Sequence, residues 1–340
     1  MGIASELQGS VQALVQSGKG ILAADESAPT IAKRFAAIGL EPTDENRRAY
    51  RSLILETPGL GEFVSGVILF EETLLQRAGD ATPLPQVAAR QGIVPGVKVD
   101  AGKIALALAP GDEITQGLDG LGKRLGPYKE QGARFAKWRA VYNITDTLPS
   151  RSAIQANAQA LARYAAICQE QGVVPIVEPE VLIDGGHSMA RCAEVTQAVL
   201  HEVFNALFEQ GVALEHIVLK PSMVLPGKAH PHPARPAEVA RETLRVLRRC
   251  VPAAVPSINF LSGGQTPAQA SANLDAMNRD GVQPWLLSFS YGRALLDPAL
   301  MAWGGQPARV RDAQTALLKR ARLNAAACQG RYTEAMEAGA

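Results

Sequence analysis

Short apolar runs alternate along the chain with longer segments in which apolar positions recur at helical spacing. The short runs are rich in Val, Ile, Leu and Phe and lack polar alternation, which is expected of strands covered on both faces. We predict eight strands, at Gly20–Ala24, Phe63–Phe70, Val94–Val99, Phe135–Tyr142, Val173–Val177, His216–Leu219, Ser257–Leu261 and Trp285–Phe289.

The segments between these runs carry helix start signals. Thr43 and Ser152 are predicted N-caps of two helices, and Thr266-Pro267 indicates a cap followed by proline at the first helical position. Strict alternation of strand and helix implies parallel strands, and eight repeats close them into a (β/α)8 barrel, the TIM-barrel fold.

Composition tells more about the function of the protein than about its fold, because it argues against some classes of function. The 340 residues are 47% hydrophobic and carry a formal net charge of +1, which argues against nucleic-acid or polybasic membrane binding. We predict one α/β domain over residues 1–340, with a helical N-terminal segment at about 1–18 and a C-terminal tail at about 329–340. No signal pattern opens the chain and the four cysteines form no Cys-x-x-Cys pair, so we expect a cytoplasmic protein with reduced thiols.

Charged side chains gather where the predicted strands end. The steps from Lys98 through Lys137, Glu178 and Lys220 to Ser262 are 39, 41, 42 and 42 residues, one βα unit each time. These side chains should therefore recur at one level of the barrel. Because catalytic groups of such barrels lie at the carboxyl ends of the strands, the crowding of lysines and carboxylates there predicts an active site.

Lys220 ends one of these strands and is followed by Pro221, which cannot donate to a sheet. An amine held at an apolar rim among other cations suits Schiff-base attack on a ketone. Taken alone, a lysine that extends its charge to water would be the simpler explanation. The other strand ends favour the chemical interpretation, but they do not distinguish Lys220 from Lys98 or Lys137.

Two further groups of residues predict separate anion sites. Glycine pairs and turns at helix starts expose backbone N–H groups, and the loops after strands 7 and 8 often hold phosphate in such barrels. One group lies on the last two strands and the other on earlier strands: Gly263, Gly264, Gly292 and Arg293, and then Ser27, Thr30, Lys98 and Arg139. Two anion sites on either side of a lysine indicate a substrate with a phosphate at each end.

Seven motifs, in this order and spacing, make the sequence resemble class I fructose-1,6-bisphosphate aldolase, a metal-free Schiff-base family, from about Lys19 to Thr333. The motifs are Gly20–Ser27, Gly96–Asp100, Phe135–Arg139, Val177–Glu180, Leu219–Val224, Leu261–Gln265 and Phe289–Leu295.

This resemblance implies reversible cleavage of fructose 1,6-bisphosphate to dihydroxyacetone phosphate and glyceraldehyde 3-phosphate, without a metal or other cofactor. It implies that Lys220 forms the iminium with the C2 ketone and that Glu178 is the acid that expels water. Asp25 would accept the proton of the C4 hydroxyl, and Lys137 would stabilise charge beside it.

The same resemblance implies substrate-binding residues at the two phosphates. The C1 phosphate is expected at Ser262, Gly263, Gly264, Gly292 and Arg293, and the C6 phosphate at Ser27, Thr30, Arg34, Lys98 and Arg139. Glu180 and Tyr291 complete the predicted set, although supporting the lysines and packing, respectively, are the simpler roles for these two.

Two departures from the family stand out. Eukaryotic members end on a tyrosine that assists proton transfer at C3, whereas this chain ends at Ala340 and Tyr332 lies too early, so we expect a different proton donor. Near the first strand, Ala28-Pro29-Thr30 replaces the usual Thr-Gly-Ser.

The resemblance also implies a homotetramer with small-molecule sugar phosphates as its ligands. One alternative is a zinc-dependent aldolase, for which His230 and His232 are the only suggestive pair and a chelator would be decisive. Another is a non-catalytic sugar-phosphate-binding or scaffold protein on the same barrel, which would have little need of the charged strand ends.

Overall fold

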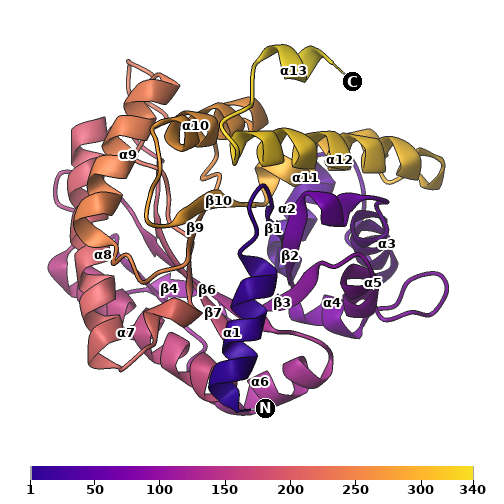
Figure 1. Ribbon diagram of the computed structural model, residues 1–340, viewed down its shortest axis with the longest axis horizontal. Helices are drawn as coiled ribbons and strands as arrows, with labels where there is room; N and C mark the ends of the chain where they lie inside the picture. The colour runs from indigo at the N-terminus through magenta and orange to yellow at the C-terminus, as the bar shows by residue number, and fades with distance from the viewer. Residues whose placement is uncertain (1, 340) are drawn as a thin grey trace.

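A closed barrel of parallel strands forms the centre of the protein in the computed structural model, which describes residues 2–339 (Figure 1). Within these residues eight strands follow one another around the barrel in chain order, and the last pairs with the first. They are β1 (Gly20–Ala24), β2 (Val64–Leu69), β3 (Val94–Lys98), β6 (Phe135–Tyr142), β7 (Val174–Val181), β8 (Val218–Leu219), β9 (Ser257–Phe260) and β10 (Leu286–Tyr291). The predicted TIM-barrel fold is confirmed. Met1 and Ala340, the ends of the predicted domain, lie outside the described residues.

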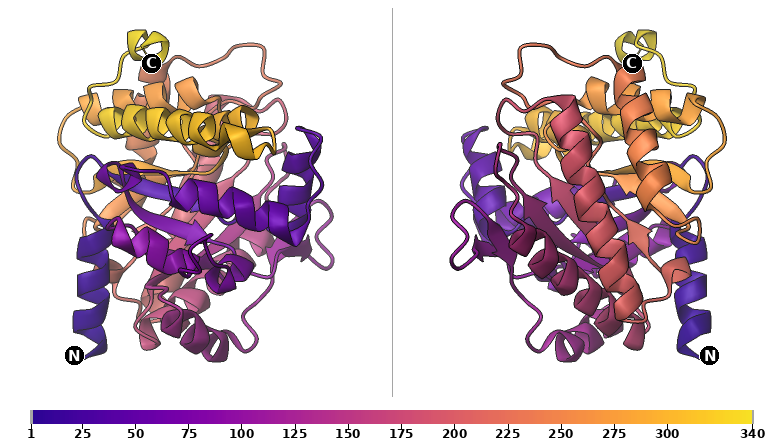
Figure 2. Two further views of the ribbon diagram at one scale, coloured as in Figure 1. Left: turned by 90° about the vertical axis from the view of Figure 1, so that its right-hand side faces the viewer. Right: turned by 90° about the vertical axis from the view of Figure 1, so that its left-hand side faces the viewer.

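Helices surround these strands on the outside (Figures 1 and 2). They are α1 (Ile3–Leu14), α2 (Ala28–Ala36), α3 (Asp44–Leu55), α4 (Glu71–Leu75), α5 (Leu84–Arg90), α6 (Leu121–Glu130), α7 (Arg151–Glu170), α8 (Met189–Glu209), α9 (Pro236–Cys250), α10 (Pro267–Arg279), α11 (Arg293–Trp303), α12 (Val310–Ala327) and α13 (Ala335–Ala338). Within residues 2–339, no helix is both long and apolar enough to cross a membrane.

Helix starts follow the predicted caps in two of three cases. Thr43 accepts a hydrogen bond from the backbone of Asn46, and Thr266 accepts one from that of Gln269. The prediction for α7 was wrong by two residues, because Ser150 is the cap and Ser152 already lies inside the helix. Both serines have the required hydroxyl, so only the backbone conformation separates them.

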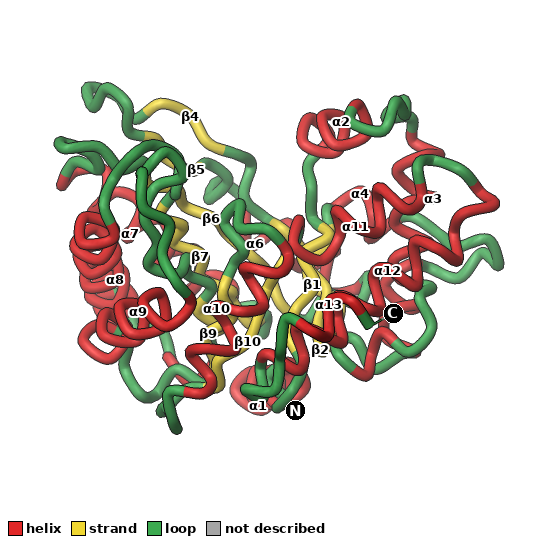
Figure 3. Tube along the Cα trace, turned by 90° about the horizontal axis from the view of Figure 1, so that it is seen from above, coloured by secondary structure: helices red, strands yellow, loops and turns green. Residues whose placement is uncertain are grey.

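Helix α1 closes one end of the barrel. Its Leu7, Val11 and Leu14 are buried in a cluster that also contains Phe135 and Val218 of the barrel strands. Figure 3 shows α1 on one side of the strands and α2 on the opposite side. Since α2 follows the carboxyl end of β1, the barrel mouth, meaning the carboxyl ends of the eight strands, opens on the side away from α1.

Glycines in the strands make room for aromatic rings both inside the barrel, at Phe135, and on its helix-covered outer face, at Phe289. A Cβ on Gly20 would stand 2.6 Å from the ring of Phe289, and one on Gly96 would overlap the ring of Phe135. A side chain at either position would therefore expel a buried ring, which explains glycine in a strand interior.

The strand register sets the charged residues of the mouth side by side. Lys98 pairs in register with Lys137, and Arg139 pairs with Glu178. Glu178 and Glu180 lie inside β7 rather than after it, because β7 is longer than predicted. Their side chains therefore project from a rigid strand.

A two-stranded antiparallel hairpin was not predicted. It consists of β4 (Lys103–Ala105) and β5 (Glu113–Thr115), in the connection that follows β3. β4 is exposed along its whole length although residues 104–109 are all apolar in sequence, so the apolar pattern did not show that this strand lies outside the barrel.

Candidate active site

Four strand ends bring the predicted catalytic residues into contact at the barrel mouth. Lys137 lies at the centre, with its Nζ 2.7 Å from Oδ2 of Asp25 and 3.4 Å from Oε2 of Glu178. The other carboxylate oxygen of Glu178 is 3.2 Å from Nζ of Lys220. Lys137, Glu178 and Lys220 are each less than 5% exposed, so the cluster is largely withdrawn from water.

The charges of this cluster hold Asp25 in its ionised form. Burial alone would raise the pKa of Asp25, but the ammonium groups of Lys137 and Lys220 outweigh it and lower the pKa to about 2. Burial would likewise lower the pKa of Lys137, yet Asp25, Glu178 and Asp100 raise it above its ordinary value. Asp25 is thus a carboxylate and Lys137 an ammonium at neutral pH.

Asp100 is a residue of this cluster that sequence reasoning did not place in the site. Its Oδ1 is 2.6 Å from Nζ of Lys98, and its Oδ2 is 4.0 Å from Nζ of Lys137. The available signal was its position just after a strand, within one of the motifs. Asp100 therefore links Lys98 to the cluster of Lys137, Glu178 and Asp25.

The residues predicted for the C6 phosphate lie on the β1, β3 and β6 side of the mouth. The hydroxyls of Ser27 and Thr30 are 3.2 Å apart at the start of α2. Arg139 forms an ion pair with Glu180, so the partner of Glu180 is an arginine rather than one of the lysines. Burial would lower the pKa of Arg139, but Glu180 and other carboxylates raise it.

Arg34 is predicted in this group but is already paired with carboxylates. It forms ion pairs with Glu26 and, at 2.6 Å, with Asp297. Glu26 also pairs with the buried Arg51 at 2.8 Å. These contacts tie α2 to α3 and α11, so in the described structure Arg34 anchors the helix that carries Thr30.

The residues predicted for the C1 phosphate lie on the β9 and β10 side. Gly263 and Gly264 have positive φ angles of 56° and 87°, which glycine adopts without strain. Ser262 precedes them and is buried, whereas Arg293 begins α11 and is exposed. The residues predicted for the two phosphates therefore form two groups on different strands, which are neighbours where β10 pairs with β1.

Tyr291 does not face the mouth, and its place among the substrate-binding residues is corrected. Its ring is fully buried, and its hydroxyl donates to the backbone carbonyl of Ala270 in α10, 2.9 Å away. Burial also raises the pKa of its phenol. The side chain packs between barrel and helix because it alternates with Ser290 along the strand.

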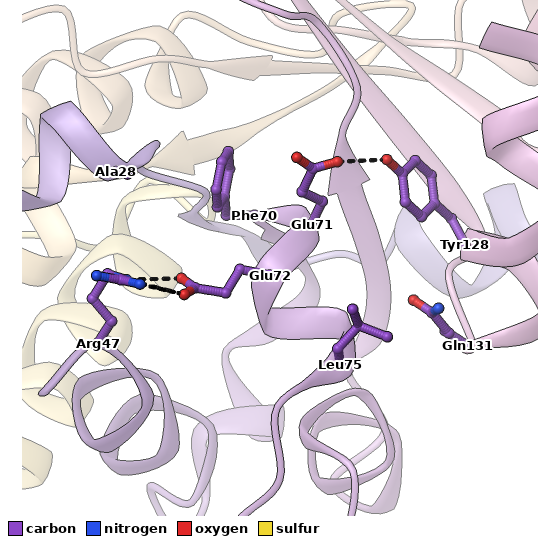
Figure 4. Close-up of a pocket in the computed structure, with 8 residues that line it drawn as sticks. All are labelled: Ala28, Arg47, Phe70, Glu71, Glu72, Leu75, Tyr128 and Gln131. Atoms are coloured by element: carbon purple, nitrogen blue, oxygen red, sulfur yellow. Dashed lines mark hydrogen bonds and ion pairs between the residues drawn. The ribbon is translucent and has the colours of Figure 1, made fainter. Parts of the chain in front are cut away.

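Two other features stand outside this cluster. A hollow of about 380 Å³ lies beside α4, where Glu72 pairs with Arg47 and Glu71 accepts a hydrogen bond from Tyr128 (Figure 4). Both of its carboxylates are thus occupied by neighbouring side chains. Residues 2–339 contain no group of three or more His, Cys, Asp or Glu side chains arranged to hold a metal ion.

A (β/α)8 barrel whose mouth holds a buried cluster of lysines and carboxylates has the arrangement of an enzyme active site. The sequence model of the fructose-bisphosphate aldolase class-I family matches residues 6–340. The chain belongs to this family. The predicted function of a class I fructose-bisphosphate aldolase is thereby confirmed.

Relatives of known name support the assignment over nearly the whole chain. A "Probable fructose-bisphosphate aldolase class 1" of Xylella fastidiosa is 52% identical over 328 residues, covering 96% of this chain and 98% of that protein. "Fructose-bisphosphate aldolase 6, cytosolic" of Arabidopsis thaliana is 52% identical over 330 residues, covering 97% and 92%. A crystal structure of the aldolase of Plasmodium falciparum, in complex with TRAP and a small-molecule inhibitor, has a TM-score of 0.96 and 49% identity, covering 97% and 96% of the two chains.

Proposed function

We propose that the chain cleaves fructose 1,6-bisphosphate through a covalent iminium on Lys220. The observation that carries this proposal is the unbroken series of contacts from Lys220 through Glu178 and Lys137 to Asp25. It places a nucleophile, an acid and a base within a few ångströms of one another in a site withdrawn from water.

The first half of the reaction uses Lys220 and Glu178. Proton transfer across their 3.2 Å contact frees the amine, which attacks the C2 carbonyl and forms a carbinolamine. Glu178 then returns a proton to the C2 hydroxyl, which leaves as water as the iminium forms. The oxygen of Glu178 that faces Lys220 is Oε1, whereas Oε2 faces Lys137.

The second half uses Asp25 and Lys137. The carboxylate of Asp25 takes the proton of the C4 hydroxyl, the C3–C4 bond breaks, and its electron pair moves into the iminium to give an enamine. Glyceraldehyde 3-phosphate leaves, C3 then receives a proton, and water releases dihydroxyacetone phosphate from Lys220. Lys137 supports the step because its charge keeps Asp25 ionised.

The two groups of residues predicted for the phosphates hold the two phosphates in this proposal. Ser262, Gly263, Gly264, Gly292 and Arg293 bind the C1 phosphate through backbone N–H groups and a guanidinium. Ser27, Thr30, Lys98 and Arg139 bind the C6 phosphate, and Arg34 and Glu180 hold this side in place. The ketone of an extended bisphosphate then lies over Lys220.

Trapping the covalent intermediate tests the assignment of the nucleophile. Borohydride added with dihydroxyacetone phosphate is expected to inactivate the enzyme irreversibly, because it reduces the iminium to a stable amine. Peptide mass spectrometry should place the added mass on Lys220. An adduct on Lys98 or Lys137 instead would contradict the proposed mechanism.

We further propose that the chain forms a homotetramer in the cytoplasm. The proposal rests on the resemblance to the aldolase family and on cytosolic relatives such as the Arabidopsis protein. Sedimentation equilibrium of the full chain at micromolar concentration is expected to give four times the mass of the chain, 36.0 kDa. A monomer at every concentration would refute the assembly.

A further inference from the structure

Lys228 lies at the barrel mouth beside the residues proposed for the C1 phosphate. It belongs to the loop that follows β8, and its Nζ stands 2.7 Å from where a Cβ on Gly264 would lie. The same point is 3.6 Å from Nη2 of Arg293. The ammonium of Lys228 and the guanidinium of Arg293 therefore both approach the side of Gly264 on which a side chain would lie.

Two like charges that converge on a glycine loop repel each other unless an anion lies between them. Gly264 has no side chain, so the ammonium of Lys228 approaches its backbone closely, and the guanidinium of Arg293 lies just beyond. A phosphate dianion has the charge and the several acceptor oxygens to bind both cations together with backbone N–H groups.

The loop that carries Lys228 is held in place by backbone hydrogen bonds. The N–H of Lys228 donates to the carbonyl of Ile183 at 2.8 Å, and the N–H of Gly227 donates to that of His187 at 2.8 Å. The loop after β8 is thereby joined to the loop after β7. The stem of Lys228 is fixed, and only its flexible side chain has to move to follow a ligand.

Asp184 competes for the same ammonium. Its Oδ1 is 3.0 Å from Nζ of Lys228, and the two side chains are 70% and 47% exposed. An ion pair this open to water contributes little, so a bound phosphate can replace the carboxylate as partner of Lys228.

We propose that Lys228 is an additional binding residue for the C1 phosphate, which it shares with Arg293, and that Asp184 holds its ammonium there while the site is empty. This inference rests on the proposed position of the C1 phosphate. The C1-phosphate site would then also include the loop after β8. Lys220, which would carry the covalent bond, directly follows the same strand.

The test measures dissociation constants of dihydroxyacetone phosphate and steady-state constants in both directions. Lys228→Gln is expected to raise the dissociation constant and the KM for fructose 1,6-bisphosphate about tenfold, with kcat and the KM for glyceraldehyde 3-phosphate little changed. Lys228→Arg should restore most of the affinity. Asp184→Asn should lower the dissociation constant about threefold, since it removes the competing carboxylate.

Lys228→Gln and Asp184→Asn are expected to change the dissociation constant in opposite directions, and this separates a binding role of Lys228 from a structural one. If the Lys228–Asp184 pair only tethered the two loops, Lys228→Gln and Asp184→Asn would weaken binding alike, and the inference would be overturned. Arg248→Gln is the matched control, because it removes a cation from a 3.0 Å ion pair with Asp280 that is similarly exposed. Arg248 lies in the last turn of α9, at the end of the barrel away from the mouth.

Arg293→Gln distinguishes this inference from the proposed function on which it rests. Weaker binding in Arg293→Gln together with unchanged binding in Lys228→Gln would overturn the role of Lys228 alone. Unchanged binding in both variants would mean that the C1 phosphate lies elsewhere, and both proposals would fall.

Discussion

Replacing Lys220 with methionine is expected to lower kcat for cleavage of fructose 1,6-bisphosphate by about 10⁵-fold, because no iminium can form. Methionine fills a similar volume without the amine. Glu178 keeps Lys137 at 3.4 Å as a partner for its charge, so the variant should remain folded. Steady-state kinetics measures the loss, and borohydride should now leave the protein unlabelled.

Lys129→Met is the control for this variant. Lys129 forms a 2.8 Å ion pair with Glu6 of α1, at the closed end of the barrel, so the same substitution there removes a lysine without touching the mouth. The two variants should have comparable melting temperatures. Full activity in Lys129→Met together with lost activity in Lys220→Met would support the role of Lys220. Turnover of Lys220→Met within tenfold of the native enzyme would eliminate Lys220 as the nucleophile.

Asp25→Asn is expected to lower kcat for cleavage by about 10³-fold, since an amide cannot take the proton of the C4 hydroxyl. The iminium forms before this step, so dihydroxyacetone phosphate and borohydride should still label Lys220. Loss of kcat while Lys220 is still labelled would show that Asp25 acts after the iminium has formed. A variant that loses both would show that Asp25 acts by holding the cluster together rather than as the base.

The low pKa of Asp25 adds a pH dependence to this prediction. Because the pKa falls from 3.8 to about 2, Asp25 stabilises the folded state at pH values above 3.8, and this contribution disappears as the pH falls through about 2. The native enzyme should therefore show no loss of kcat from protonation of Asp25 above about pH 3. Asp280→Asn, at the closed end of the barrel, serves as the control for a lost carboxylate.

Most of the fold was predictable because barrel strands are buried on both faces. The apolar run Phe135–Tyr142 is β6 residue for residue, and the predicted strand Gly20–Ala24 is β1. The exposed hairpin β4–β5 was missed because its strands are only three residues long and lie outside the barrel. The cap of α7 was misplaced because Ser150 and Ser152 differ in backbone conformation and not in chemistry.

The candidate site was predictable as a group of residues but not as a set of contacts. Spacing placed Lys98, Lys137 and Lys220 at one level, and the family resemblance alone singled out Lys220. The structure distinguishes them by partner, since Lys98 lies against Asp100 while Lys220 lies against Glu178. It also turns Tyr291 away from the mouth, which strand alternation predicts only once the strand ends are known.

The order of apolar runs determined the barrel by itself, because burial on both faces leaves a pattern in the chain that needs no knowledge of neighbours. The same pattern determined which charged residues stand at the mouth, since each lies in or just after a predicted strand. Only the tertiary structure decided which charge meets which: Asp25 with Lys137, and Lys228 with Asp184 and Gly264. The physical reason is that an ion pair depends on the direction of side chains over a few ångströms, between residues brought together by barrel closure rather than by the sequence.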